Sequence, residues 1–159
     1  MFRKKFETGT ERSSNNKPTQ LSGFLFTQKL FKLILNNYFS NMKIGLIYGS
    51  DTGATEEVSI KIKEAFNNYN IERHNIANVN EEIILSFDFL IFGLSTWYDG
   101  DLQSDWEIYF DDFKKIDFKN KLVAIYGLGD QWGYDEYFVD GIGIIAKEII
   151  KNNGKIIGE

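Results

Sequence analysis

The chain has 159 residues, of which 43% are hydrophobic and 16% aromatic, and a net charge of −5. Because domains commonly hold about 100–200 residues, this length predicts one domain, and the apolar content excludes a wholly disordered protein. The chain has no cysteine and a single histidine, His74. This excludes disulfides, thiolate zinc sites, cysteine-bound iron–sulfur clusters and multi-histidine metal sites, and it fits a reducing compartment.

The net charge is unevenly distributed along the chain. Residues 1–41 hold 7 of the 18 basic and 2 of the 23 acidic residues, which gives +5 there and −10 for residues 42–159. An acidic domain repels the phosphates of nucleic acid and attracts basic proteins. We therefore expect a basic partner protein and no nucleic acid.

Residues 1–41 are expected to lie outside the folded domain. Residues 1–20 are polar and basic and contain the only proline, a composition typical of disorder. Residues 21–39 are more apolar, but lysines interrupt the run, so it predicts an amphipathic helix and no membrane span. The segment is either an organellar targeting peptide or a dispensable extension upstream of Met42. We favour the extension, which predicts a cytoplasmic protein with no membrane partner.

Continuous apolar runs follow Met42 and predict strands that are buried on both faces, as in parallel sheets. His74 falls on the weakest of these strands, where we expect a surface or edge position. The predicted strands are residues 43–48, 88–93 and 121–127, a weaker strand at 71–76 and another that begins at 155–158.

Apolar residues at helical spacing predict helices between the strands, the last of them ending before Gly154. Alternation of strands and helices predicts an α/β fold with an open, doubly wound parallel sheet. Ligands bind such sheets beyond the carboxyl ends of the strands, where we expect the loops 49–55, 94–103 and 128–137. The helical stripes are Val58, Ile62 and Phe66; Trp106, Tyr109, Phe110 and Phe113; and Phe138, Ile142, Ile145, Ala146 and Ile149, with a short helix at 80–86.

The loop 49–55 places three hydroxyls, those of Ser50, Thr52 and Thr55, at the start of a helix. The free amides and the dipole of a helix N-terminus favour an anion, and Gly53 allows close approach of the backbone. An ordinary helix cap is the alternative, although a cap needs only one hydroxyl. Because the loop has no Walker A lysine, we expect it to hold a phosphate and not to transfer one.

Aromatic residues mark the other two loops. Trp97 and Tyr134 are expected over the same end of the sheet, where two rings can enclose a flat conjugated ligand. Trp106 and Phe110 are assigned to the core of their helix. Trp132 is expected as a surface ring near the site.

These motifs resemble those of the flavodoxin family, of the long-chain type, over residues 42–159. Ser59 stands where the family signature usually has Ala, and Leu94 and Leu128 stand where Thr is common. The chain ends within what resembles the start of the fifth strand, so we expect the rest of that strand and the final helix of the family to be missing. The motifs are Ser50-Asp51-Thr52-Gly53-Ala54-Thr55; Ser95-Thr96-Trp97 and Gly100-Asp101-Leu102-Gln103-Ser104-Asp105-Trp106; and Gly127-Leu128-Gly129-Asp130-Gln131 with Gly133-Tyr134.

The resemblance implies a flavodoxin-like sheet of order 2-1-3-4-5 in three α/β/α layers. It also implies one non-covalently bound FMN that carries single electrons at low potential between redox proteins. Trp97 and Tyr134 would stack on the two faces of the ring. The implied cofactor-binding residues are Ser50, Asp51, Thr52, Gly53, Ala54, Thr55, Ser95, Thr96, Trp97, Tyr98, Asp99, Gly100, Gly129, Asp130, Gln131 and Tyr134.

The resemblance implies an electron carrier and not an enzyme, so no residue is named catalytic and no metal is expected. The implied partners of this monomer are a donor like the ferredoxin or flavodoxin–NADP reductases and a low-potential acceptor. One alternative is an FMN-dependent NAD(P)H:quinone reductase on the same fold, which would need room for a second substrate where Tyr134 stands. Another is a binding module that has lost FMN, which the three intact loops oppose.

Overall fold

The apolar runs of the sequence form the strands of a parallel sheet in the computed structural model, which describes residues 42–133 and 135–158. The predictions for residues 1–41 fall outside the described residues. The order of the parallel strands is β2-β1-β3-β5-β6, and β4 is an added antiparallel partner of β3, so the expected order 2-1-3-4-5 is confirmed. The strands are β1 (Ile44–Tyr48), β2 (Ile71–Asn75), β3 (Phe89–Trp97), β4 (Asp101–Leu102), β5 (Leu122–Leu128) and β6 (Lys155–Ile156).

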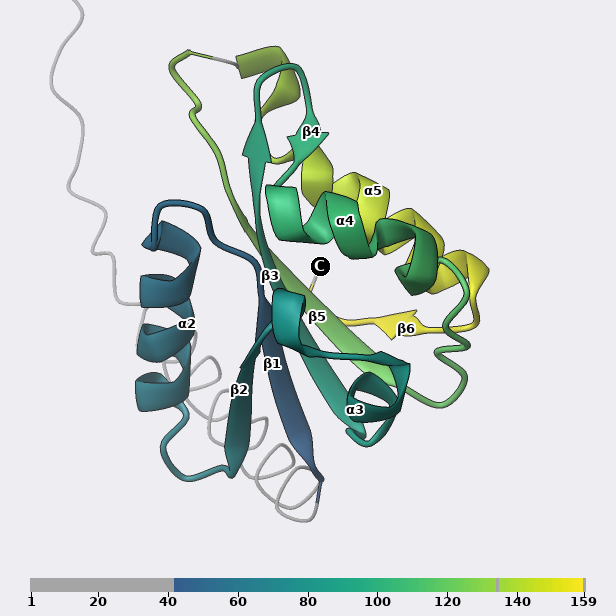
Figure 1. Ribbon diagram of the computed structural model, residues 1–159. Helices are drawn as coiled ribbons and strands as arrows, with labels where there is room; N and C mark the ends of the chain where they lie inside the picture. Colours follow the sequence, from purple (N-terminus) through teal and green to yellow (C-terminus); the bar gives the residue numbers. More distant parts are fainter. Residues whose placement is uncertain (1–41, 134, 159) are drawn as a thin grey trace, which may run out of the picture. The chain divides into compact units, whose positions relative to one another are not determined.

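Helices cover both faces of this sheet. Figure 1 shows α2 on one face and α4 and α5 on the other. None of the helices in the described ranges is long and apolar enough to cross a membrane. The helices are α2 (Ala54–Ala65), α3 (Glu81–Leu85), α4 (Ser104–Phe113) and α5 (Asp140–Lys151), with short 3₁₀ turns at Ile76–Asn78 and Asp135–Tyr137.

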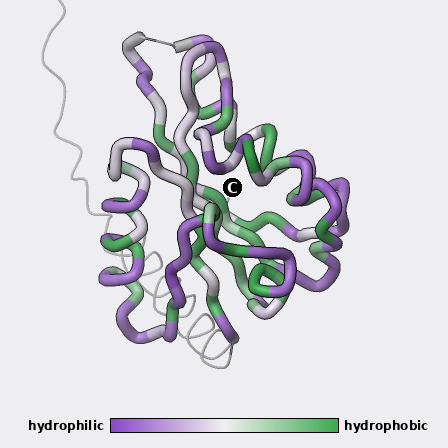
Figure 2. Tube along the Cα trace, in the orientation of Figure 1, coloured by the Kyte–Doolittle hydropathy of each residue, from purple (hydrophilic) through white to green (hydrophobic). Residues whose placement is uncertain are grey.

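Alternating residues of β3 build a core on each side of the sheet. Phe92 points into the larger core on the side of α4 and α5, and Ile91 points into the smaller core on the side of α2. The ring of Phe92 meets those of Trp106 and Phe113 edge-on, at centroid distances of 5.4 and 5.5 Å. Trp106 is therefore a core residue, as expected, and Figure 2 shows the apolar strands enclosed between helices with polar outer faces.

The second loop is shorter than the predicted loop 94–103. β3 continues to Trp97, reverses direction and pairs Thr96 with Leu102 in a small hairpin. The prediction missed this hairpin because its second strand, Asp101–Leu102, is too short to show a period of its own.

The start of α5 also differs from the prediction. The helix begins at Asp140, and not at Phe138, because Val139 has a φ of 57° that a right-handed helix does not accommodate. At the other end, the helix stops at Lys151, before Gly154 as predicted, and Asn153 takes a left-handed conformation with a φ of 68°.

Replacing Phe92 with alanine is expected to lower the free energy of unfolding by about 3–5 kcal/mol, the usual cost of removing a buried aromatic ring. Ile108→Ala is the control, because Ile108 is 82% exposed on α4. Its effect should stay within about 0.5 kcal/mol. Urea unfolding followed by circular dichroism measures both values, and equal losses in the two variants would contradict the central place of Phe92.

Candidate functional site

The first loop joins β1 to α2 and leaves the start of that helix without a side-chain cap. Gly53 is the N-cap residue with a φ of 87°, and no side chain accepts a hydrogen bond from the first turn. The hydroxyl of Ser50 instead accepts from the amide of Gly53 at 3.0 Å, within the loop itself. Because none of the loop hydroxyls caps α2, its first amides are available to an anion.

The side chains of this loop lie at different depths. Asp51, Thr52 and Ala54 are exposed, whereas Thr55 is buried against the sheet at 1% exposure. An anion at this helix end would therefore contact exposed atoms of the loop on its solvent side. On its other side it would contact the first turn of α2, which is packed against the sheet.

Two tyrosines hold the first turn of α2 to the sheet. Tyr48 of β1 donates to Oε1 of Glu56 at 2.7 Å, and Tyr126 of β5 donates to the carbonyl of Thr55 at 3.0 Å. Burial is the largest cause that raises the pKa of both phenols, so both remain neutral donors at physiological pH. The ring of Tyr126 crosses above Gly93, where a Cβ would lie 2.2 Å from it.

The second loop is the β3–β4 hairpin, whose chain reverses over three residues. Tyr98 and Gly100 have φ values of 44° and 101°, and the amide of Gly100 donates to the carbonyl of Trp97 at 3.2 Å. The indole Nε1 of Trp97 donates to the hydroxyl of Ser95 at 3.0 Å, which fixes the plane of the ring. The Thr96 hydroxyl accepts from the amide of Gly141 in α5, so this hydroxyl points toward the helix layer.

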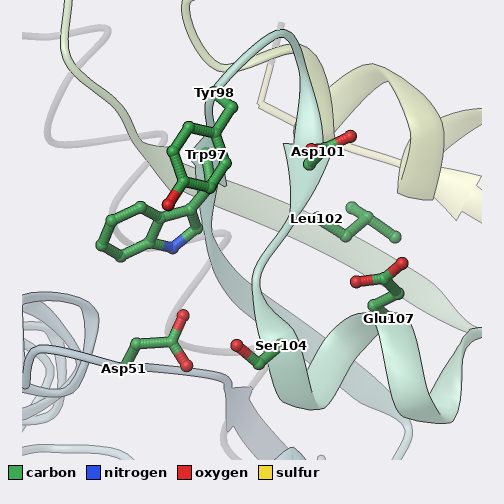
Figure 3. A pocket seen from close by; sticks show the side chains of 7 residues that line it. All are labelled: Asp51, Trp97, Tyr98, Asp101, Leu102, Ser104 and Glu107. Atoms are coloured by element: carbon green, nitrogen blue, oxygen red, sulfur yellow. The ribbon is translucent and has the colours of Figure 1, made fainter.

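A pocket of about 250 Å³ joins the first loop to the second (Figure 3). It places Asp51 of the first loop with Trp97 of the second, as expected for loops that leave the same end of the sheet. The predicted space between Trp97 and Tyr134 is not tested by this pocket, because Tyr134 lies outside the described residues. The lining residues are Asp51, Trp97, Tyr98, Asp101, Leu102, Ser104 and Glu107.

Gln103 is a site residue that the sequence prediction did not assign. Its side chain is fully buried, and Nε2 donates to Oδ1 of Asp51 at 2.8 Å and to Oδ2 of Asp105 at 3.1 Å. Its Oε1 caps the amide of Trp106 at the start of α4. Gln103 therefore ties the first loop to α4. Its sequence signals are its place in the motif from Gly100 to Trp106 and its position immediately before a helix.

The third loop is shaped by Asp130. Its Oδ1 accepts from the amides of Trp132 and Gly133, both at 3.0 Å, which is a turn closed by a side chain. Trp132 is 97% exposed at the tip of this loop, as the expected surface ring. Gly129 and Gln131 are also exposed. The enclosure of a ligand between Trp97 and Tyr134 stays a prediction.

Comparison with known proteins decides the family. Residues 46–159 match the family model described as Flavodoxin. The chain belongs to the flavodoxin family. It is 47% identical over 116 residues to the flavodoxin of Buchnera aphidicola from Baizongia pistaciae, a match that covers 72% of this chain and 67% of that protein. It is 44% identical over 114 residues to the flavodoxin of Haemophilus influenzae, covering 72% of this chain and 65% of that one.

Solved flavodoxin structures share the same fold. The flavodoxin of Fusobacterium nucleatum bound to flavin mononucleotide is 28% identical, with a TM-score of 0.70 over 74% of this chain and 70% of that one. The resemblance inferred from the three loop motifs is therefore confirmed, and the chain spans about two thirds of the length of these relatives. The roles assigned to individual site residues remain predictions.

Gly53→Ala is expected to lower the free energy of unfolding by about 1–2 kcal/mol, because only glycine adopts a left-handed backbone without strain. Gly143→Ala, inside α5, is the matched control. A Cβ would have no neighbour within 4 Å at either position, and only Gly53 has a positive φ. The control should gain about 0.5–1 kcal/mol. Urea unfolding of both variants gives the two values, and a stabilised Gly53→Ala would show that the loop does not need this conformation.

Proposed function

We propose that this protein binds one FMN non-covalently and carries single electrons at low potential between redox proteins. The observation that carries the proposal is the uncapped start of α2, which shares one end of the sheet with the indole of Trp97. A helix N-terminus suits a phosphate, and a loop indole suits a flat ring system. Membership of the flavodoxin family and the FMN-bound structure of a relative support the same cofactor.

The phosphate would be held by the loop residues Ser50 to Thr55. The ring would lie on Trp97, with the backbone from Thr96 to Gly100 and from Gly129 to Gln131 along its edges and Tyr134 on its outer face. Bound flavin supplies one-electron chemistry, while the protein orients it, limits its contact with water and sets the charge around it. The residues present fit this group.

Low potential would come from negative charge near the ring. Asp99, Asp101 and Asp130 are all exposed on the two ring-binding loops. Fixed carboxylates disfavour the addition of electrons to a neighbouring group, and the effect weakens as salt screens it. These three side chains would therefore lower the reduction potential of the flavin, so that the reduced flavin is a stronger electron donor.

The partner would be a protein with a basic surface around an apolar centre. Trp132 and Tyr98 are exposed by 97% and 63% on loops that carry carboxylates. Exposed aromatic rings act as anchors in transient complexes, and opposite charge steers the encounter. A reductase of the ferredoxin or flavodoxin–NADP type fits this description, and the cysteine-free composition suits a cytoplasmic location.

Mixing the protein with FMN tests the proposal directly. We expect quenching of flavin fluorescence, a shift of the visible spectrum and a redox titration that resolves two one-electron steps. A steady-state assay with NAD(P)H and a quinone, without added reductase, separates the carrier from the quinone reductase. Turnover in that assay, or full fluorescence of FMN in the mixture, would contradict the proposed function.

Trp97→Ala is expected to weaken FMN binding by about 5- to 150-fold, since stacking on an aromatic ring contributes about 1–3 kcal/mol for a flat base. Trp132→Ala is the matched control, because it removes a tryptophan from the neighbouring loop without a predicted ring contact. It should leave the affinity for FMN unchanged and weaken electron transfer from a basic NADP reductase. Fluorescence titration and stopped-flow reduction measure these effects, and equal FMN affinities for the two variants would exclude stacking on Trp97.

A further inference from the structure

Arg73 lies on β2, and its side chain reaches Glu56 and Ser59 near the start of α2. Its Nε donates to the hydroxyl of Ser59 at 2.9 Å, and its guanidinium lies 5.2 Å from the ring centre of Tyr48. The side chain is 22% exposed, and its Nη2 is buried with no hydrogen-bond partner in the described part of the chain. A charged group in such a position calls for an electrostatic explanation.

Ser59 links Arg73 to the start of the helix through hydrogen bonds. Its side chain is fully buried and donates to the carbonyl of Glu56, one turn earlier. An alanine at this position could neither accept from Arg73 nor donate to Glu56. The hydroxyl therefore couples Arg73 to the first turn of α2.

Carboxylates in this turn oppose the binding of an anion at the same helix end. Glu56 and Glu57 both lie in the first turn of α2. Glu57 pairs with Lys61 on the outer surface at 2.6 Å, and both side chains are 67% exposed. Oε1 of Glu56, whose side chain is 48% exposed, accepts from Tyr48 and lies 3.6 Å from Nη2 of Arg73. Arg73 is thus the cation that offsets Glu56, and the solvent screens this pair less than the pair of Glu57 and Lys61.

We propose that Arg73 is a positioning residue for the phosphate of the cofactor. It holds Glu56 and Ser59 on the sheet side of α2 and offsets the negative charge of Glu56, so that the first-turn amides can donate hydrogen bonds to a dianion. It supplies positive potential from behind the loop, which has no lysine of its own. This inference rests on the proposed function, because it assumes that FMN binds through this loop.

Arg73→Leu tests the role, with FMN and riboflavin as the two probes. Riboflavin shares the ring of FMN but lacks the phosphate. We expect the affinity for FMN to fall about tenfold, equivalent to about 1.4 kcal/mol, and the affinity for riboflavin to change less than about twofold. Flavin fluorescence quenching measures both dissociation constants, and circular dichroism checks that the variant is folded.

Further variants separate charge from packing. Glu56→Gln added to Arg73→Leu should restore most of the FMN affinity, because it removes the carboxylate that Arg73 offsets. Lys61→Ala is the matched control, since it leaves Glu57 unpaired on the exposed side of the same turn and should change FMN affinity less than about twofold. If Arg73→Leu does not fold, Arg73→Lys takes its place, because it keeps the positive charge. The Arg73→Lys variant should retain more of its FMN affinity at low salt than at high salt.

The outcomes distinguish the inference from the function on which it rests. If the wild-type protein binds neither FMN nor riboflavin, the proposed function and the role of Arg73 both fail. If the wild type binds FMN but Arg73→Leu weakens FMN and riboflavin equally, Arg73 only supports packing and the inference alone is overturned. Failure of Glu56→Gln to restore FMN affinity would also overturn it.

Discussion

The placement of the first turn of α2 is the constraint on which the site depends. Its amides can bind an anion only if the position of the turn is fixed, because displacement of a donor worsens both the length and the angle of its hydrogen bond. Hydrogen bonds reach this turn from Tyr48 on β1 and from Tyr126 on β5, so strands on both sides of β3 fix one helix end. Gln103 holds the preceding loop through Asp51 from the opposite side of the sheet.

Two glycines make these contacts geometrically possible. A Cβ at Gly49 would lie 2.0 Å from Oε1 of Gln103, and a Cβ at Gly93 would lie 2.2 Å from the ring of Tyr126. Gly49 follows β1 and Gly93 is the last β3 residue that pairs with β1, and the amide of Gly49 donates to the carbonyl of Gly93 at 3.0 Å. Their missing side chains leave room for buried polar groups on both faces where β1 and β3 meet the loops.

The sequence predicted the parts of the fold that depend on local pattern. The central strands were found because their residues are apolar without interruption, and the first loop was found because glycine and hydroxyl residues cluster before a helix. The β4 hairpin and the start of α5 depend on single pairings and on the φ of Val139, which no periodicity reports. Arg73 was predicted only as part of a weak strand, because its contacts with Ser59 and Glu56 arise only when α2 packs against the sheet.

Negative charges around the candidate site are exposed, whereas the positive charge of Arg73 is partly buried behind the loop. Asp51, Asp99 and Asp101 are exposed around the candidate site, and such a rim by itself repels an anionic cofactor. In the proposed role, the helix N-terminus and the partly buried guanidinium of Arg73 would counter that repulsion from behind the loop, while a lysine on the loop would have neutralised the rim. Positive charge behind the helix leaves the outer surface acidic, as the proposed docking of a basic redox partner at the same edge of the sheet would require.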